Sequence, residues 1–132
     1  MSIPVISGDG IFSHIFLGAT DIERSASFYD AALGALGIKN LGPFGNGWVL
    51  YGREKPAFIV ARPGNGDLPS SNGATIGFAA ATPAEVDAFH VAGLAAGGTD
   101  EGKPGPRGHL PGAYAAYLRD PAGNKICTYS FV

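Results

Sequence analysis

The chain of 132 residues contains little cysteine and little charge. Its single cysteine, Cys127, excludes an internal disulfide and a four-cysteine zinc site. The nine basic residues are spread along a chain of net charge −2, which excludes the basic patch of a nucleic-acid-binding protein. No apolar run approaches the roughly 20 residues that span a bilayer, and the N-terminal residues lack the basic start of a signal peptide. We therefore expect a cytoplasmic protein that binds neither nucleic acid nor membrane.

Glycine and proline, by contrast, are abundant. The 21 glycines and 10 prolines follow no three-residue period, which excludes collagen and indicates many tight turns. Hydrophobic residues make up 45% of the chain, which is enough to build a core. The length favours one domain over residues 1–132.

A helix start occurs twice. Thr20 followed by Glu23, and Thr82 followed by Glu85, fit the capping box, in which the threonine side chain accepts from a backbone N–H while the glutamate reaches back. Apolar residues at steps of three and four predict helices over about residues 21–36 and 83–96, each ended by glycine.

Shifting the chain by 61 residues superposes the two helices and the apolar runs before them. The identical pairs are Ile15 and Ile76, Ala19 and Ala80, Phe28 and Phe89, Leu33 and Leu94, and Gly37 and Gly98. Strands are expected at 11–17, 47–51 and 57–62, at 75–80, 113–119 and 125–131, and as shorter segments near 38–41 and 99–101. The expected fold is therefore α+β, with module one over about 9–62, a linker over 63–73 and module two over 74–132.

The repeated segments carry a family resemblance. The segment from His14 to Tyr29 (HIFLGATDIERSASFY) resembles the opening of the vicinal oxygen chelate superfamily, and Tyr117 to Ile126 (YLRDPAGNKI) resembles its ending. This superfamily includes glyoxalase I, bleomycin-resistance proteins and extradiol dioxygenases. The resemblance implies two tandem βαβββ modules that form a cupped mixed sheet, usually completed as a homodimer.

The same resemblance implies where a metal site would lie. Family ligands are His, Glu or Gln on the first strand of each module and on late strands. His14 matches the first position, but Thr75 and Cys127 stand at two others, and Val60 or Ile59 stands at the remaining one. A stable divalent site needs about three protein ligands or more. We therefore expect no metal cofactor, with a divalent metal as the alternative.

Candidate catalytic residues are His14 and His109, which lies in the segment GKPGPRGHLPG over residues 102–112. His109 could act as acid or base, and Arg107 could hold a carboxylate, although a solvated turn is an equal reading of this segment. Tyr114 and Tyr117 are three apart on a strand, so only one of them can face the cup. His90 is expected at the surface or in an interface.

Candidate ligand-binding residues are Trp48, Phe58, Arg107, His109 and Tyr114, with the two aromatics either walling a pocket or packing in the core. The leading hypothesis is a metal-independent protein that binds or sequesters a small-molecule ligand. The alternatives are a lyase or isomerase that uses His14, and a structural or partner-binding dimer.

Overall fold

The structure, a computed structural model, describes residues 11–45 and 47–131. Residues 1–10, Asn46 and Val132 of the expected single domain lie outside the described residues. Module one contains β1 (Ile15–Gly18), α1 (Ile22–Gly34), β2 (Lys39–Phe44), β3 (Trp48–Gly52) and β4 (Phe58–Ala61). Module two contains β5 (Ile76–Ala79), α2 (Pro83–Ala95), β6 (Thr99–Pro106), β7 (Tyr114–Arg119) and β8 (Lys125–Ser130). The predicted α+β fold with two tandem βαβββ modules is confirmed.

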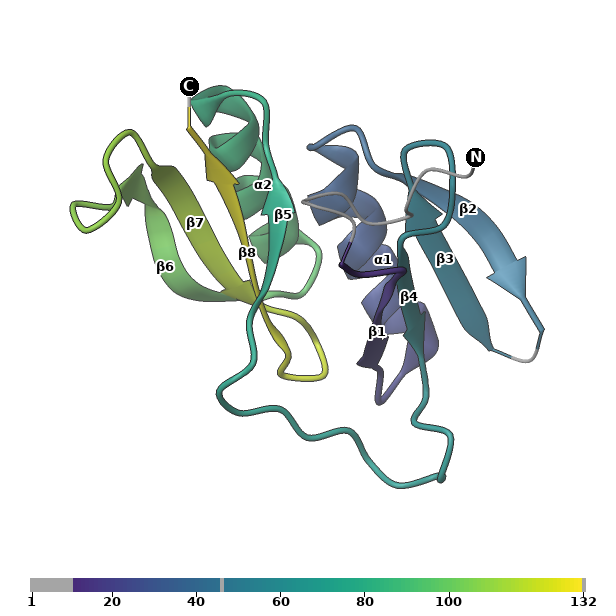
Figure 1. The fold of residues 1–132 in the computed structure, drawn as a ribbon. Coiled ribbons are helices and arrows are strands. Elements are labelled where there is room, and N and C mark those ends of the chain that lie inside the picture. The colour runs from purple at the N-terminus through teal and green to yellow at the C-terminus, as the bar shows by residue number, and fades with distance from the viewer. Residues whose placement is uncertain (1–10, 46, 132) are drawn as a thin grey trace.

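Each module forms one four-stranded mixed sheet. The strand orders are β1-β4-β3-β2 and β5-β8-β7-β6, so the two sheets have the same topology. In each, the first strand pairs parallel to the last and the other neighbours are antiparallel. A long segment joins the C-terminal end of β4 to β5 (Figure 1).

The two helix starts differ from each other. Thr82 caps α2 and accepts from the Glu85 backbone N–H at 3.2 Å, while the Glu85 side chain accepts from the Ala81 N–H at 2.8 Å. In α1 the prediction that Thr20 is the cap is wrong. Asp21 caps this helix through its side chain, which accepts from the N–H groups of Glu23 and Arg24. Aspartate and threonine offer the same kind of oxygen one residue apart, and the sequence pattern does not distinguish them.

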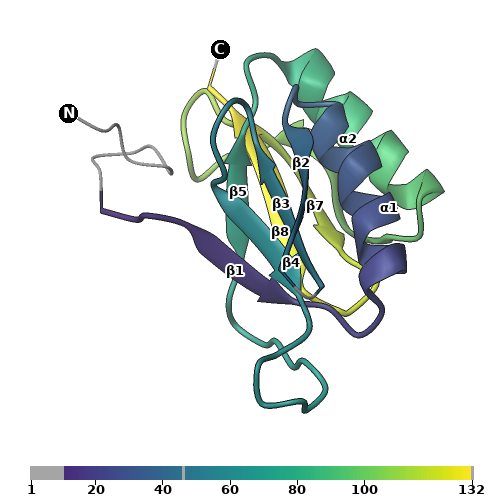
Figure 2. The same cartoon turned by 90° about the vertical axis from the view of Figure 1, so that its right-hand side faces the viewer.

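The core lies between the helices and one face of each sheet, with α1 and α2 together on one side of the molecule (Figure 2). Phe28, Tyr29 and Leu33 from α1 and Val86 and Phe89 from α2 are fully buried. The predicted helix stripes are thus confirmed, except that Leu94 is 39% exposed. No helix in the described part of the chain is long and apolar enough to cross a membrane.

The modules are joined by reciprocal contacts at their seam. The Asn124 side chain, in the turn before β8, donates to the Gly18 carbonyl at the end of β1 at 2.8 Å. At the matching place 61 residues on, the Ala79 carbonyl at the end of β5 accepts from Arg53, which follows β3, at a longer 3.5 Å. The Tyr29 hydroxyl also crosses the seam and donates to buried Asp120 at 2.5 Å. The two seam contacts at Gly18 and Ala79 thus lie at matching places of the repeat.

Two sequence expectations in module two are corrected. His90 is buried rather than at the surface, because its Nε2 lies 2.8 Å from Asp100 on β6. The segment after residue 101 continues as strand to Pro106, with an irregular register against β7. β6 is an edge strand, where prolines and shifted pairing are tolerated.

Candidate ligand-binding faces

Each sheet has one face covered by its helix, and we call the opposite one its open face. Residues alternate between the two faces along a strand, so the core residues identify the open ones. Because both helices lie on one side, both open faces lie on the other (Figure 2). The open faces are the surfaces that would line the cup implied by the family resemblance.

The open face of module one is apolar and aromatic. The residues on this face alternate along their strands with core residues, or are cross-strand partners of residues that do. They are Phe16, Phe44, Trp48, Leu50 and Ile59. The Trp48 ring lies 5.4 Å from Phe16 in an edge-on arrangement and 5.9 Å from Phe44. Trp48 is 37% exposed, Phe16 40% and Phe44 61%. Three neighbouring rings with this exposure form a surface suited to flat, apolar groups.

His14 lies at the edge of this face. It precedes β1 and is two residues from Phe16, so alternation places it on the same side of the sheet. Its imidazole is exposed, and Nδ1 lies 3.0 Å from the Ser13 hydroxyl. Among the described residues the Ser13 hydroxyl is the hydrogen-bond partner of this ring, and no carboxylate bonds to it.

The open face of module two has a different composition. Two tyrosine side chains lie beside a part of the sheet that carries small residues. Tyr117 on β7 and Tyr129 on β8 hydrogen-bond to each other through their hydroxyls, with ring centroids 5.9 Å apart. Phe131 stacks on Tyr129 at 5.9 Å and is 63% exposed. Gly77 and Cys127 are register partners beside them. A Cβ at Gly77 would lie 3.4 Å from the Cys127 sulfur, so glycine keeps this part of the sheet low.

Two cations lie against the Tyr117 ring. The Arg107 guanidinium is 5.5 Å and the Lys125 ammonium 5.2 Å from its centroid, within the range of cation–π attraction. The carbonyls of Gly105, Pro106 and Lys103 accept from the two terminal nitrogens of Arg107 at 3.0–3.2 Å. Gly102 makes room for this arrangement, since a Cβ there would lie 3.2 Å from Tyr117 and 3.4 Å from Arg107.

The charge of this face is not neutralised. Glu101 is paired with Arg119 at 2.9 Å. Within residues 11–45 and 47–131, no acidic side chain forms an ion pair with Arg107 or Lys125. The Tyr117 phenol and the Cys127 thiol keep their protons, because burial raises the pKa of Tyr117 to about 12 and that of Cys127 to about 11. At neutral pH the face therefore carries positive charge and hydrogen-bond donors, and no group poised to accept a proton.

Sequence reasoning placed Arg107 here but missed Lys125 and Tyr129. The signal was available, because a period of two counted from Cys127 along β8 gives Lys125, Tyr129 and Phe131 on one face. Tyr117, rather than Tyr114, is the tyrosine of β7 on the open face. The Tyr114 hydroxyl donates to Asp87 on α2 at 2.7 Å, which places it on the helix side.

The structure places two other candidates away from any open face. Phe58 is 3% exposed and packs in the core against Tyr29, Tyr51 and Phe78. His109 is exposed in a tight turn between β6 and β7 that is held by backbone bonds from Arg107 to Ala113 and from Leu110 to Arg107. Trp48 lies where a ligand could touch it, on the open face of module one.

The residues at the family's metal positions do not fit a divalent ion. His14 and Thr75 are exposed, and Cys127 places a soft sulfur where the family resemblance implies a carboxylate, so these positions do not offer the oxygen ligands that a hard cation prefers. Ile59 and Val60 offer no donor atom. In the part of the chain that the structure describes, no three His, Cys, Asp or Glu side chains group as metal ligands would.

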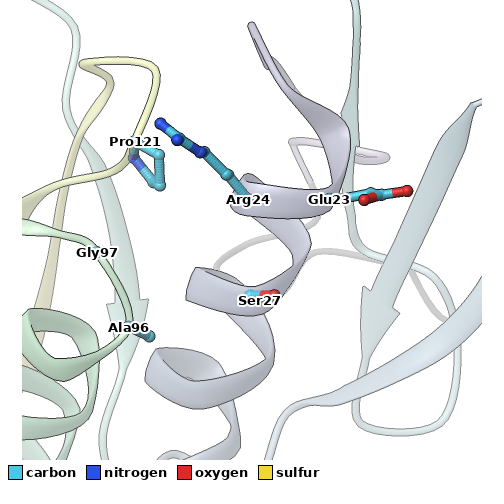
Figure 3. A pocket seen from close by; sticks show the side chains of 6 residues that line it. All are labelled: Glu23, Arg24, Ser27, Ala96, Gly97 and Pro121. Carbon is cyan, nitrogen blue, oxygen red and sulfur yellow. The ribbon is translucent and has the colours of Figure 1, made fainter.

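A shallow depression of about 410 Å³ lies elsewhere, on the helix side of the seam. Its lining comes from the start of α1, the end of α2 and the turn before β8: Glu23, Arg24, Ser27, Ala96, Gly97 and Pro121. Arg24 points toward Pro121, while Glu23 points away on the other side of the helix (Figure 3). This depression brings together none of the candidate residues, so it does not locate the ligand site.

A profile of the Glyoxalase/Bleomycin resistance protein/Dioxygenase superfamily matches residues 11–128, nearly the whole of both modules. The chain belongs to this superfamily. The match confirms the resemblance carried by the segments from His14 to Tyr29 and from Tyr117 to Ile126. No curated protein matches the chain.

Solved structures of the superfamily share the fold. A glyoxalase/bleomycin resistance protein from Albidiferax ferrireducens T118 is 47% identical, with a TM-score of 0.80 over 91% of this chain and 98% of that one. A family enzyme from Burkholderia phytofirmans PsJN is 18% identical, with a TM-score of 0.72 over 91% and 98%. A lactoylglutathione lyase from Agrobacterium tumefaciens is 21% identical, with a TM-score of 0.61 over 89% and 91%. The last two show the fold alone.

Proposed function

We propose that this superfamily member binds and sequesters a small organic molecule on its open faces without a divalent metal. The observation that carries the proposal is the Trp48 cluster, in which three neighbouring aromatic rings are between 37% and 61% exposed on a sheet face. The absence of a divalent metal from the proposal is supported by the residues at the family's metal positions, which do not form a suitable set of ligands. An apolar surface without a suitable set of metal ligands is better suited to binding a ligand than to catalysis by a metal acting as a Lewis acid.

The proposal includes a homodimer. Exposed Phe16, Phe44 and Phe131 leave apolar surface open to solvent in a single copy. A second copy that covers the open faces would turn them into the walls of a cavity. Light scattering coupled to gel filtration tests this part, and a monomer at all concentrations would contradict it.

A lyase or isomerase reaction that uses His14 is the second candidate function. It is favoured by the exposed imidazole at the edge of the Trp48 cluster, since imidazole can donate or accept a proton in general acid–base catalysis. This reaction predicts turnover that is lost in His14→Gln. Sequestration predicts that the same variant still binds ligand.

The test joins metal analysis with a ligand screen. The purified chain is measured for zinc, nickel, iron and manganese, and a library of aromatic metabolites is then screened by thermal shift after chelation. We expect substoichiometric metal and a raised Tm with selected compounds, since a ligand selective for the folded state stabilises it. Trp48 is the only tryptophan, so quenching of its fluorescence reports contact at module one directly. Stoichiometric metal together with no binding after chelation would overturn the proposal.

A further inference from the structure

We infer that the open face of module two recognises the carboxylate of a flat organic anion, and this inference rests on the proposed function. The face has the two features that such a ligand needs, namely uncompensated positive charge and an adjacent aromatic surface. On the helix side, Arg24 lies beside Asp21 and Arg53 donates to the Ala79 carbonyl in the seam.

The positive charge comes from Lys125 and Arg107, which flank one ring and have no acidic partner among the described residues. Three backbone carbonyls hold the terminal nitrogens of Arg107, while its Nε–H has no acceptor in the described part of the chain. The guanidinium is therefore fixed in place before a ligand arrives. A cation that is already ordered loses little entropy when it meets an anion.

The phenol pair adds a neutral donor. When two hydroxyls bond to each other, one donates and the other accepts, so one O–H of the Tyr117–Tyr129 pair stays free to donate to a ligand. Both tyrosines stand on the same face as Lys125, at positions that alternate along β7 and β8. A carboxylate accepts hydrogen bonds and cannot donate them, so it suits the free phenol O–H, the Arg107 Nε–H and the Lys125 ammonium, all of which donate.

The aromatic surface comes from Tyr129 and Phe131, whose rings are stacked with an interplanar angle of 24°. The exposed face of Phe131 continues this stack outward. A planar ring attached to the carboxylate would pack against the Tyr129 ring, which lies beside the Tyr117 ring that Lys125 flanks, so that its anionic end meets Lys125. An aliphatic acid or an uncharged aromatic compound would satisfy only half of the face.

The experiment compares three probes with the same naphthalene ring and different charge: naphthoate, naphthamide and naphthylmethylammonium. Their affinities for the full chain are measured by isothermal titration calorimetry. We expect naphthoate to bind about tenfold more tightly than naphthamide and the cation more weakly than either. Raising the ionic strength should weaken naphthoate binding and leave naphthamide unchanged, because salt screens only the charged contact.

Lys125→Met tests the site itself, with Lys39→Met on the edge strand of module one as a matched control. We expect Lys125→Met to reduce naphthoate affinity about fivefold and to leave naphthamide affinity unchanged. Tyr129→Phe should reduce naphthoate affinity about threefold, since it removes one hydroxyl of the pair. The control should behave as the natural chain.

Three results would overturn the inference. These are equal affinity for naphthoate and naphthamide, equal losses in Lys125→Met and Lys39→Met, and no binding of any probe. Equal affinity for the charged and neutral probes would leave the proposed function standing, because a neutral ligand would still be bound. Metal at full stoichiometry with an empty ligand screen would instead remove the proposed function and the inference together.

Discussion

The two modules share one topology and present different chemistry on their open faces. Module one presents Phe16, Phe44 and Trp48, an apolar surface with His14 at its edge. Module two presents two phenols with Arg107 and Lys125. The helix-side residues that hold each sheet to its helix are alike in kind, since each module buries a phenylalanine at the repeated position 28 or 89. The two modules thus share this packed phenylalanine, whereas their open faces carry different side chains.

The difference between the two open faces can be tested at Cys127, which is the only cysteine of the chain and lies on the open face of module two. The pKa of about 11 predicts alkylation at about pH 8 to be roughly two hundredfold slower than for an ordinary cysteine, because only the thiolate reacts. The rate should keep rising with pH well above pH 9. The measurement is mass spectrometry of iodoacetamide-treated protein over a pH series.

The chain unfolded in urea serves as the control, and its thiol should react at the ordinary rate. A fast, pH-insensitive reaction in the folded chain would show that Cys127 is a thiolate. That result would reopen the metal question for module two.

The two modules also differ in how strongly their residues are held at the seam. Asp120 is buried and accepts from the Tyr29 hydroxyl, the backbone N–H groups of Ala122 and Asn124, and the Asn124 side chain. We expect Asp120→Ala to lower the free energy of unfolding by about 3 kcal/mol, since it leaves several buried donors without an acceptor. Urea denaturation followed by circular dichroism measures the loss.

Two variants make the comparison quantitative. Tyr29→Phe removes one of those donors and should cost about 1 kcal/mol. Arg53→Ala removes the longer contact to Ala79 together with the 2.7 Å bond to the Leu36 carbonyl just after α1, and should cost no more than about 1 kcal/mol. A loss for Arg53→Ala as large as that for Asp120→Ala would contradict unequal anchoring.

The proposed dimer depends on the apolar face of module one. Phe44→Asp should raise the dimer dissociation constant at least about tenfold, because it places a charge in a surface that loses water on association. Val91→Asp is a matched control, since Val91 is also exposed but lies on α2 on the other side of the molecule. Sedimentation equilibrium compares the two, and equal effects would contradict a dimer formed through the open face.

The smallest expected effect concerns pH and the His90–Asp100 pair of module two. The hydrogen bond from His90 is the main cause of the lowered pKa of Asp100, followed by that from the Gly102 N–H. A lowered pKa in the folded state contributes stability above the ordinary aspartate pKa, and this contribution is lost as pH falls through the lowered value. We therefore expect Asp100→Asn to flatten slightly the loss of Tm between about pH 5 and pH 2. A Tm profile identical to that of the natural chain would contradict this.

Local patterns predicted most of the fold. The repeat at 61 residues, the strand alternation and the Thr82 cap are short-range signals, and the superfamily resemblance linked them into two βαβββ modules. What failed was set by contacts between different elements, which local patterns do not contain. His90 on α2 is buried and bonds to Asp100 on β6, and Phe58 lies in the core against Phe78 of the other module.

The candidate site divided in the same way. Trp48 and Arg107 were found from composition and loop character, while Lys125 and Tyr129 were missed because their importance depends on Tyr117, which stands on the neighbouring strand. From the sequence, Phe58 and Tyr114 were predicted as ligand-binding residues on the same grounds as Trp48 and Arg107. Their faces were fixed by the register of β4 and β7 against their neighbours.

The sequence by itself determined that there are two similar modules, that one cysteine stands where a carboxylate would be expected, and that glycine and proline confine the strands. Hydrophobic periodicity and turn chemistry are properties of neighbouring residues, so they can be read along the chain. Only the tertiary structure decided that the positive charge gathers on one open face and the aromatic cluster on the other. Charge and stacking act between side chains through space, and strands that are far apart in the sequence supply them.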